Sequence, residues 1–316
     1  MINRLMDVGG KMDTYISNIS YATGEQKEIV SLSGNGVDER TIAMFSKFGL
    51  KCYREFNGSI YDLAVKAAEQ TLKENHNQIA EMIFTTGSFH SQPEPYNRIS
   101  NIRELNTVID KLGIEAYPYG IFLSDCANVM SAIRIGKSLL YENPNKDILI
   151  VSSDVTGKTE SRIVPPGSSI KSDGAGSCIL SGKPNGASFM ILSVKQYHNS
   201  RMLNNSGFAN YSIELMKCMD FVKDEFFNEG IDNYKLVLVN NYSNGFARSL
   251  AKQIGIPVEL IYTEQIAGYA HCFASDIFIN LSKLIADGCI SDGDNILAIA
   301  SGPSSISGIS LKYVNK

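Results

Sequence analysis

The chain contains 316 residues, of which 44% are hydrophobic and 20% are charged, and its formal net charge is −4. This length and hydrophobic content are enough for a large buried core, in one big domain or in two packed halves. The charged fraction argues against a disordered chain, and the interspersed charges lack the basic stripe that nucleic-acid binding needs. We therefore expect a globular protein without a nucleic-acid partner.

The apolar runs are of strand length, as at residues 147–151 and 235–239, and are too short to cross a bilayer. Residues 1–13 contain no apolar segment of the kind that directs secretion. The six cysteines are scattered and form no Cys-x-x-Cys pair, so neither a zinc site nor a disulfide framework is expected. These features predict a cytoplasmic protein without a membrane partner or bound metal, in which one cysteine can serve as a nucleophile.

The first half of the chain alternates helix-like and strand-like segments, which favours an α/β architecture. Residues 59–74 carry apolar side chains at helical spacing behind Ser59, a suitable N-cap. A strand over 82–86, a helix over about 97–111 and a strand over 119–123 follow. Next, a helix begins after Cys126, ends at Asn143 and Pro144, and leads into a strand over 148–153.

The second half repeats this order. Helices are predicted over 212–227, 247–254 and 276–286, and strands over 235–241, 258–262 and 295–300. The path from Cys126 through a helix to the strand at Ile148 resembles the path from His271 to the strand at Ile296. We interpret this as an internal duplication, with residues 1–185 and 186–316 forming two similar halves packed face to face. A pseudo-twofold axis would then bring Cys126 and His271 together from two helix starts.

Three stretches carry motifs of one known enzyme family. Residues 124–133 (SDCANVMSAI) have the form of its nucleophile segment. Residues 152–156 (SSDVT) and 171–176 (KSDGAG) resemble its Ser-Asp and Gly-Asp-Gly-Ala-Gly pattern, and residues 288–294 and 301–308 resemble its C-terminal Gly-Asp and Gly-rich loop. In this order and at these distances, the motifs resemble those of the ketoacyl-ACP synthase III family of thiolase-fold enzymes, from about Thr14 onward.

The resemblance implies a thiolase-like fold, an α-β-α-β-α duplication of five layers that commonly assembles as a homodimer. The N-terminal half would carry the nucleophile Cys126, and the C-terminal half would carry the remaining catalytic side chains. It also implies that Cys126 takes an acyl group from a thioester of coenzyme A or acyl carrier protein and passes it to a second substrate. No permanently bound cofactor is expected.

The chain departs from the family at the catalytic histidine and asparagine. Asn240 or Asn241 occupies the histidine slot, and His271, one of four histidines, stands two residues beyond the asparagine slot. A decarboxylating condensation needs neutral donors for an enolate oxygen, whereas acyl transfer to an alcohol or amine needs a base. His271 as base, with one of these asparagines as donor, suits transfer to oxygen or nitrogen at least as well as carbon–carbon bond formation. Asp276 either orients His271 or caps its own helix.

The oxyanion loop also differs. In the family, the amides of the cysteine and of a glycine in the C-terminal loop bind the oxyanion. The counterpart of that glycine here is Pro303, which has no N–H group, so the resemblance leaves Gly302 or Ser304 as the donor.

The binding site for the thioester donor has lost one family feature, because the chain contains no tryptophan to stack on the adenine of coenzyme A. Lys47 and Lys158 stand where basic residues can meet a phosphate. Arg248 and Lys252 share one helix face and either meet an acidic carrier protein or are simply solvated.

Cys126 precedes a helix, and the helix dipole is expected to lower the pKa of its thiol, although the neighbouring Asp125 opposes this effect. We predict an acyltransferase that moves an acyl group through a Cys126 thioester to a small-molecule acceptor, in a specialised natural-product or a fatty-acid or lipid pathway. The alternatives are a decarboxylating ketoacyl synthase, a thioesterase that uses water, and a low-activity helper subunit of a thiolase-fold heterodimer.

Overall fold

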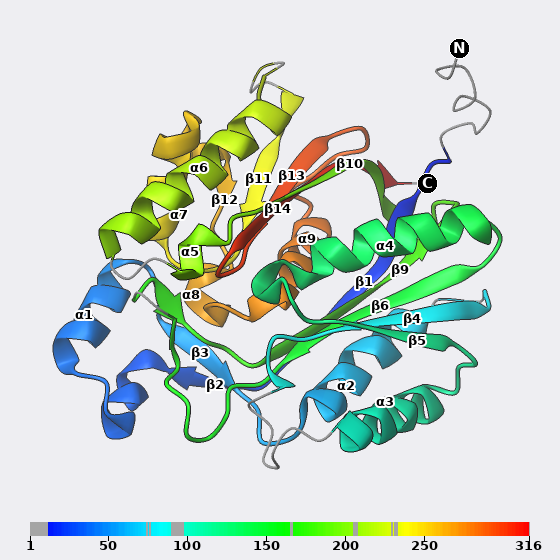
Figure 1. Cartoon of the computed structure of the whole chain (residues 1–316), viewed down its shortest axis with the longest axis horizontal. Coiled ribbons are helices and arrows are strands. Elements are labelled where there is room, and N and C mark those ends of the chain that lie inside the picture. Colours follow the sequence, from blue (N-terminus) through cyan, green and yellow to red (C-terminus); the bar gives the residue numbers. More distant parts are fainter. Residues whose placement is uncertain are drawn as a thin grey trace.

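Helices and sheets alternate in five layers, in the predicted order α-β-α-β-α (Figure 1). The computed structural model describes residues 12–73, 75, 77–89, 98–164, 167–204, 208–228, 230 and 233–315. Among these residues, no helix is both long and apolar enough to span a membrane. The α/β class and the layered duplication expected from the sequence are confirmed.

A 10-stranded sheet connects the two halves of the molecule. In spatial order its strands are β12 (Ile261–Tyr262), β11 (Leu236–Val239), β13 (Asn295–Ser301), β14 (Ser305–Asn315), β10 (Ala187–His198), β1 (Tyr15–Thr23), β9 (Gly174–Ser181), β6 (Asp147–Asp154), β4 (Ile79–Thr85) and β5 (Tyr117–Ile121). It consists of two five-stranded units, which meet where β1 pairs with β10 over residues 15–17.

The two units have the same strand order and the same pattern of directions. In the N-terminal unit β4 is parallel to β5 and β6, and β9 is antiparallel to β6 and β1. In the C-terminal unit β11 is parallel to β12 and β13, and β14 is antiparallel to β13 and β10. The boundary predicted after residue 185 lies between β9 and β10, and we propose it as the division between the two repeats.

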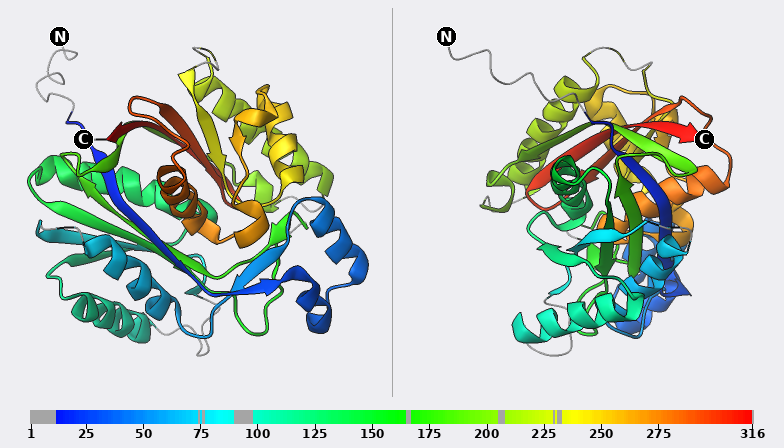
Figure 2. Two further views of the ribbon diagram at one scale, coloured as in Figure 1. Left: turned by 180° about the vertical axis from the view of Figure 1, so that it is seen from behind. Right: turned by 90° about the vertical axis from the view of Figure 1, so that its right-hand side faces the viewer.

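Six helices complete the layers. They are α2 (Ile60–Leu72) and α3 (Arg98–Leu112) outside the N-terminal unit, α4 (Asn128–Glu142) and α9 (Asp276–Ala286) between the units, and α6 (Phe208–Phe226) and α7 (Asn244–Ile254) outside the C-terminal unit. Seen from behind, α9 lies between the two five-stranded units (Figure 2). Ser59 is the N-cap of α2, as predicted, and it also forms a capping box with Asp62.

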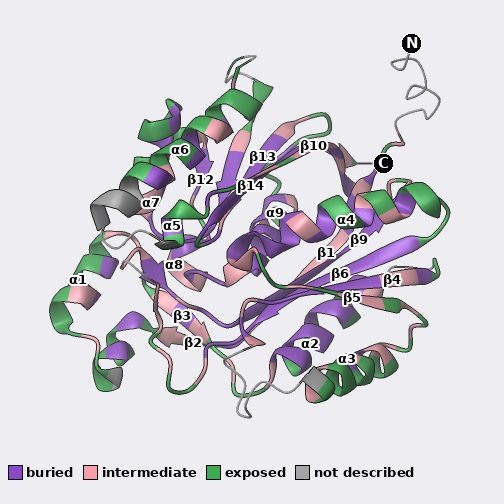
Figure 3. Ribbon diagram, viewed as in Figure 1, coloured by how far each residue is buried: buried purple, intermediate pink, exposed green. Residues whose placement is uncertain are grey.

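The central helices approach the sheets closely because small residues stand at the contacts. A Cβ atom on Gly136 of α4 would come within 2.7 Å of Leu180 on β9. One on Gly176 of β9 would come within 2.6 Å of Phe278 on α9. Every residue of β6 and β9 is buried, as expected for strands covered by helices on both faces (Figure 3).

Smaller elements lie outside these five layers in the described part of the chain. They are β2 (Glu25–Glu28), β3 (Cys52–Glu55), β7 (Ile163–Val164), β8 (Ser169–Ile170), α1 (Glu39–Lys47), α5 (Arg201–Asn204) and α8 (Ile266–Tyr269). The predicted strand over 258–262 is shorter than expected, because residues 258–260 form a 3-10 turn after Pro257 and β12 keeps two residues.

Candidate active site

The two central helices begin side by side, and each is preceded by a short 3-10 turn. The turn before α4 spans Asp125–Ala127 and contains Cys126. The turn before α9 spans Phe273–Ser275, and His271 lies between it and α8. The two turns correspond, so Ala274 is the counterpart of Cys126, and His271 supplies an imidazole from the segment just before the second turn.

The backbone at this point is held in conformations that non-glycine residues rarely adopt. Asp125 has a φ of 48°, Ala270 of 52° and Phe273 of 53°. In the described part of the chain, these are three of the four non-glycine residues with positive φ. Such conformations cost free energy and persist where the surrounding structure enforces them, which is common at functional sites.

Cys126, His271 and Asp276 form a continuous chain of contacts. The Cys126 Sγ lies 3.1 Å from Nε2 of His271, and Nδ1 of His271 lies 2.6 Å from Oδ2 of Asp276. Cys126 is 7% exposed, whereas His271 and Asp276 are almost completely buried. Because a carboxylate only accepts hydrogen bonds, Nδ1 carries the proton and Nε2 presents its lone pair to the sulfur. Of the two roles predicted for Asp276, the contacts support orientation of His271.

Backbone and side-chain donors fix the Asp276 carboxylate. Oδ1 accepts hydrogen bonds from the Cys272 N–H at 2.7 Å and from Nδ2 of Asn241 at 3.3 Å. Oδ2 also accepts one from the Asn241 N–H at 2.8 Å. Asn280 in turn donates to Oδ1 of Asn241 at 3.1 Å. This network fixes the carboxylate at its contact with the imidazole.

The pKa of the Cys126 thiol is raised, whereas the sequence predicted that it is lowered. Burial raises this pKa well above its ordinary value, and the carboxylates of Asp125, Asp154 and Asp276 raise it further. The predicted lowering by the helix dipole is therefore wrong, because burial and three carboxylates outweigh the dipole of a helix that begins two residues later, at Asn128. The sulfur rests as a thiol, and a base must remove its proton when it attacks.

Asn240 and Asn241 serve the framework rather than the sulfur in their observed hydrogen bonds. Asn240 donates to the Phe273 carbonyl at 3.3 Å and accepts from the Ser301 N–H at 2.9 Å. Asn241 is bound to Asp276. Each side-chain amide thus helps to join the turns around His271, and the role of one of them as a donor to the thioester stays a prediction.

The C-terminal loop packs directly against the nucleophile turn. A Cβ atom on Gly302 would lie 2.5 Å from the Ser124 carbonyl oxygen, so glycine is required at this contact. The Gly302 N–H donates to the Ser305 carbonyl at 2.8 Å and is not available to an oxyanion in this arrangement. Ser304 is almost buried in the same turn, and it stays our predicted oxyanion donor together with the Cys126 amide.

Sequence reasoning missed Tyr242, which is buried against the imidazole. Its ring centroid lies 4.3 Å from that of His271, and its hydroxyl donates to the Ser301 carbonyl at 2.8 Å. The one available signal was an aromatic residue directly after Asn241 in the family's histidine region.

Asp154 is a second buried carboxyl beside the nucleophile. Its Oδ1 accepts hydrogen bonds from the Thr86 hydroxyl, the Gly87 N–H and the Ser88 hydroxyl, at 3.1, 2.7 and 2.8 Å. Burial nevertheless raises its pKa to about 7, with a contribution from the charge of Asp125. The Ser-Asp motif was recognised in the sequence, but its place beside Cys126 was not.

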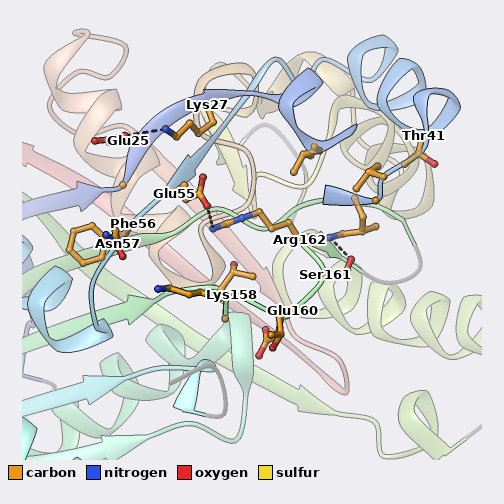
Figure 4. Close-up of a pocket in the computed structure, with 18 of the residues that line it drawn as sticks. Glu25, Lys27, Thr41, Glu55, Phe56, Asn57, Lys158, Glu160, Ser161 and Arg162 are labelled. Atoms are coloured by element: carbon orange, nitrogen blue, oxygen red, sulfur yellow. Dashed lines mark hydrogen bonds and ion pairs between the residues drawn. The ribbon is translucent and has the colours of Figure 1, made fainter. Parts of the chain in front are cut away.

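The predicted carrier-binding residues are all exposed but lie in two regions. Lys158 lines a cavity of about 1550 Å³ between β2, β3, α1 and residues 156–163, and Cys126 is not among its lining residues (Figure 4). Lys47 ends α1, and Arg248 and Lys252 lie on α7. A hydrogen bond of 2.9 Å from the Asn244 N–H to the Phe48 carbonyl joins these two helices.

Comparisons with known proteins agree with this architecture. Residues 229–311 match the model of the 3-oxoacyl-[acyl-carrier-protein] synthase III C-terminal family. The acyltransferase ChlB3 has a similar structure, with a TM-score of 0.81 and 18% identity over 96% of this chain and 98% of that chain. A comparison of the sequence with curated proteins found no match.

Two further solved structures are similar. The 3-oxoacyl-[acyl-carrier-protein] synthase III of Aquifex aeolicus has a TM-score of 0.70 and 18% identity over 95% of this chain and 100% of that chain. The tetronic acid condensing enzyme AbyA1 has a TM-score of 0.74 and 16% identity over 95% and 99%. The resemblance to the ketoacyl-ACP synthase III family is therefore confirmed, in the C-terminal region by sequence and over the whole chain by the fold.

Proposed function

We propose that the protein is an acyltransferase that carries its acyl group on Cys126 and delivers it to an oxygen or nitrogen of a small acceptor. The observation that carries this proposal is the chain of contacts from Sγ of Cys126 to Nε2 of His271 and from Nδ1 to Asp276. This is the arrangement of a nucleophile, a base and an orienting carboxylate.

The first half-reaction loads the enzyme. As Sγ attacks the thioester carbonyl, Nε2 of His271 takes the thiol proton, and the buried Asp276 carboxylate stabilises the resulting imidazolium. The oxyanion would receive N–H donors from Cys126 and Ser304. When it collapses, the donor's sulfur leaves and takes the proton from Nε2, so a Cys126 thioester and a free thiol result.

The second half-reaction uses the same imidazole in the same way. The acceptor's hydroxyl or amine attacks the Cys126 thioester while its proton passes to Nε2 of His271. The Cys126 thiolate leaves and recovers this proton. His271, oriented by Asp276, can accept the acceptor's proton in this step. Binding an enolate oxygen would instead require hydrogen-bond donors.

A decarboxylating condensation is the second candidate. It is favoured by the match to the synthase III model and by the likeness to a tetronic acid condensing enzyme. It needs two neutral donors at the enolate oxygen, and both candidate asparagines are engaged elsewhere. We therefore rank it second.

We propose coenzyme A or acyl carrier protein as the thioester donor, with Lys47, Lys158, Arg248 and Lys252 as contacts for its phosphate or acidic groups. We also propose a homodimer that forms at the free edge of β5. There Tyr117 is 65% exposed and Leu123 is 86% exposed, and an open edge strand with apolar side chains favours pairing. A cytoplasmic location fits six free cysteines.

Intact-mass measurement tests the proposal. The protein is incubated with acyl-coenzyme A or acyl carrier protein, and we expect an acyl adduct that Cys126→Ala abolishes and Cys289→Ala, an exposed control, retains. Alcohol or amine acceptors should then discharge the adduct. Release of carbon dioxide from a malonyl thioester, with no discharge by these acceptors, would favour condensation. If no adduct forms with either donor, the helper-subunit alternative replaces both.

A further inference from the structure

We propose that Tyr242 is a positioning residue for acyl transfer, which holds the His271 ring against the nucleophile and anchors the turn that carries the oxyanion donor. This inference rests on the proposed function. Tyr242 follows β11, directly after Asn240 and Asn241. No motif identified in the sequence includes it.

The ring of Tyr242 lies on the imidazole. The two ring centroids are 4.3 Å apart, with an angle of 38° between their planes. On another side, Phe246 of α7 packs on the phenol ring at 4.7 Å and 62°. Asp276 fixes one edge of the imidazole through Nδ1, and Tyr242 restricts rotation about this contact. Together they keep Nε2 directed at the sulfur.

The hydroxyl of Tyr242 fixes the oxyanion turn. It donates to the Ser301 carbonyl at 2.8 Å, and the Ser301 N–H is held by Oδ1 of Asn240 at 2.9 Å. The next residue, Gly302, lies against the Ser124 carbonyl, two positions before the nucleophile. One side chain thus connects the base with the turn that approaches Cys126.

The phenol also acts on the sulfur. Tyr242 acts to lower the pKa of the Cys126 thiol, against the larger effects of burial and of Asp125, Asp154 and Asp276, because its hydroxyl can donate to a thiolate. When the sulfur becomes a thiolate it is a stronger acceptor than a carbonyl. The phenol proton would then favour the sulfur, which stabilises the attacking species.

Tyr242→Phe tests the hydroxyl, because it keeps the ring. We expect acyl loading of Cys126, followed by quenched intact mass, to slow about tenfold. We also expect the pH midpoint of Cys126 alkylation by iodoacetamide to rise, since a hydrogen-bond donor for the thiolate is lost. The alkylation profile needs no acyl donor, so it reports on Tyr242 even if the proposed function fails.

The matched control is Tyr61→Phe. Tyr61 is also buried, stacks on a phenylalanine and donates its hydroxyl to Asn101 at 2.8 Å, but it lies on α2. It should change neither the loading rate nor the alkylation midpoint. A second variant, Tyr242→Leu, removes the ring and should slow loading about tenfold more than Tyr242→Phe.

The proposal is overturned by three results. One is a wild-type alkylation midpoint and loading rate in Tyr242→Phe. Another is an equal change in Tyr61→Phe, which would indicate general loosening of the fold. The third is equal loading by Tyr242→Leu and Tyr242→Phe, which would refute the role of the ring. A different outcome would separate the two proposals. If neither the wild type nor any variant loads an acyl group, but Tyr242→Phe still shifts the alkylation midpoint, the acyltransferase function is rejected and the effect of Tyr242 on the sulfur is supported.

Discussion

The two halves of this molecule place different chemistry on the same scaffold. Before α4, the N-terminal half presents a thiol after a residue with positive φ, and before α9, the C-terminal half presents an imidazole between two such residues. The strand pattern around the two is the same. Asp125 and Phe273 begin the two corresponding turns with positive φ, and these turns carry Cys126 and Ala274. The imidazole comes instead from His271, two residues before the second turn, so only one half uses the turn itself for the proposed chemistry.

The buried carboxyl groups of the two halves, Asp276 and Asp154, differ in the hydrogen bonds that they accept. Asp276 accepts hydrogen bonds on both oxygens, from Cys272 and Asn241, and also meets His271. Asp154 accepts three hydrogen bonds on Oδ1, whereas among the described residues its Oδ2 has no hydrogen-bond partner. The Asp276 carboxylate is placed to support an imidazolium, whereas burial, with Oδ2 lacking a partner among the described residues, favours the neutral form of Asp154. The following predictions separate these roles.

The largest effect is expected for His271→Ala. Without a base at 3.1 Å from the sulfur, loading and transfer should both slow by about a thousandfold. Rapid-quench mass measurement of each half-reaction gives the two rates. His198→Ala, at the exposed end of β10, is the control and should retain both. An unchanged transfer rate in His271→Ala would show that another group deprotonates the acceptor.

Asp276→Asn should have the next largest effect, about a hundredfold on both half-reactions. The amide keeps the size of the carboxylate, but it loses the negative charge that stabilises the imidazolium and can donate to Nδ1, which selects the wrong tautomer. The Asp110→Asn variant, on the exposed part of α3, serves as the control for an Asp-to-Asn change. If Asp276→Asn retains the wild-type transfer rate, Asp276 caps the start of α9 and does not orient His271 for catalysis.

The third prediction concerns the pH dependence of stability, not a rate. The folded-state pKa of Asp154 is raised to about 7, above its unfolded value of about 4, so its protonated form stabilises the fold at low pH. This stability is fully present below pH 4 and is lost as pH rises to 7. Between pH 5 and pH 8 the loss reaches at most about 3 kcal/mol.

Asp154→Asn should remove this part of the pH dependence, because an amide does not titrate. Urea unfolding at pH 5 and pH 8 for the wild type, Asp154→Asn and Asp110→Asn measures it. We expect the free energy of unfolding to fall less with pH in Asp154→Asn than in the other two proteins. Equal slopes in all three would mean that the Asp154 carboxyl is ionised at pH 5 in the folded state.

Local features of the sequence were enough for much of the fold. The Ser59 cap, the end of α4 at Asn143 and the strand β6 were predicted, because capping, helix termination and apolar runs depend on neighbouring residues. The long strands β1, β10 and β14 were not predicted. Residue exposure is mixed along most of β1 and β10, and their pairing partners are far away in sequence.

The sequence by itself determined the α/β class, the duplication and the choice of Cys126 and His271 as the residues to examine. Tertiary structure alone decided that these two, 145 positions apart, meet through Nε2, and that Asp276 orients the ring while Asn240 and Asn241 bind the framework. It also reversed the expected direction of the Cys126 pKa. The physical reason is that a helix start can be recognised locally, whereas burial and the positions of surrounding carboxylates arise only when both halves are packed together.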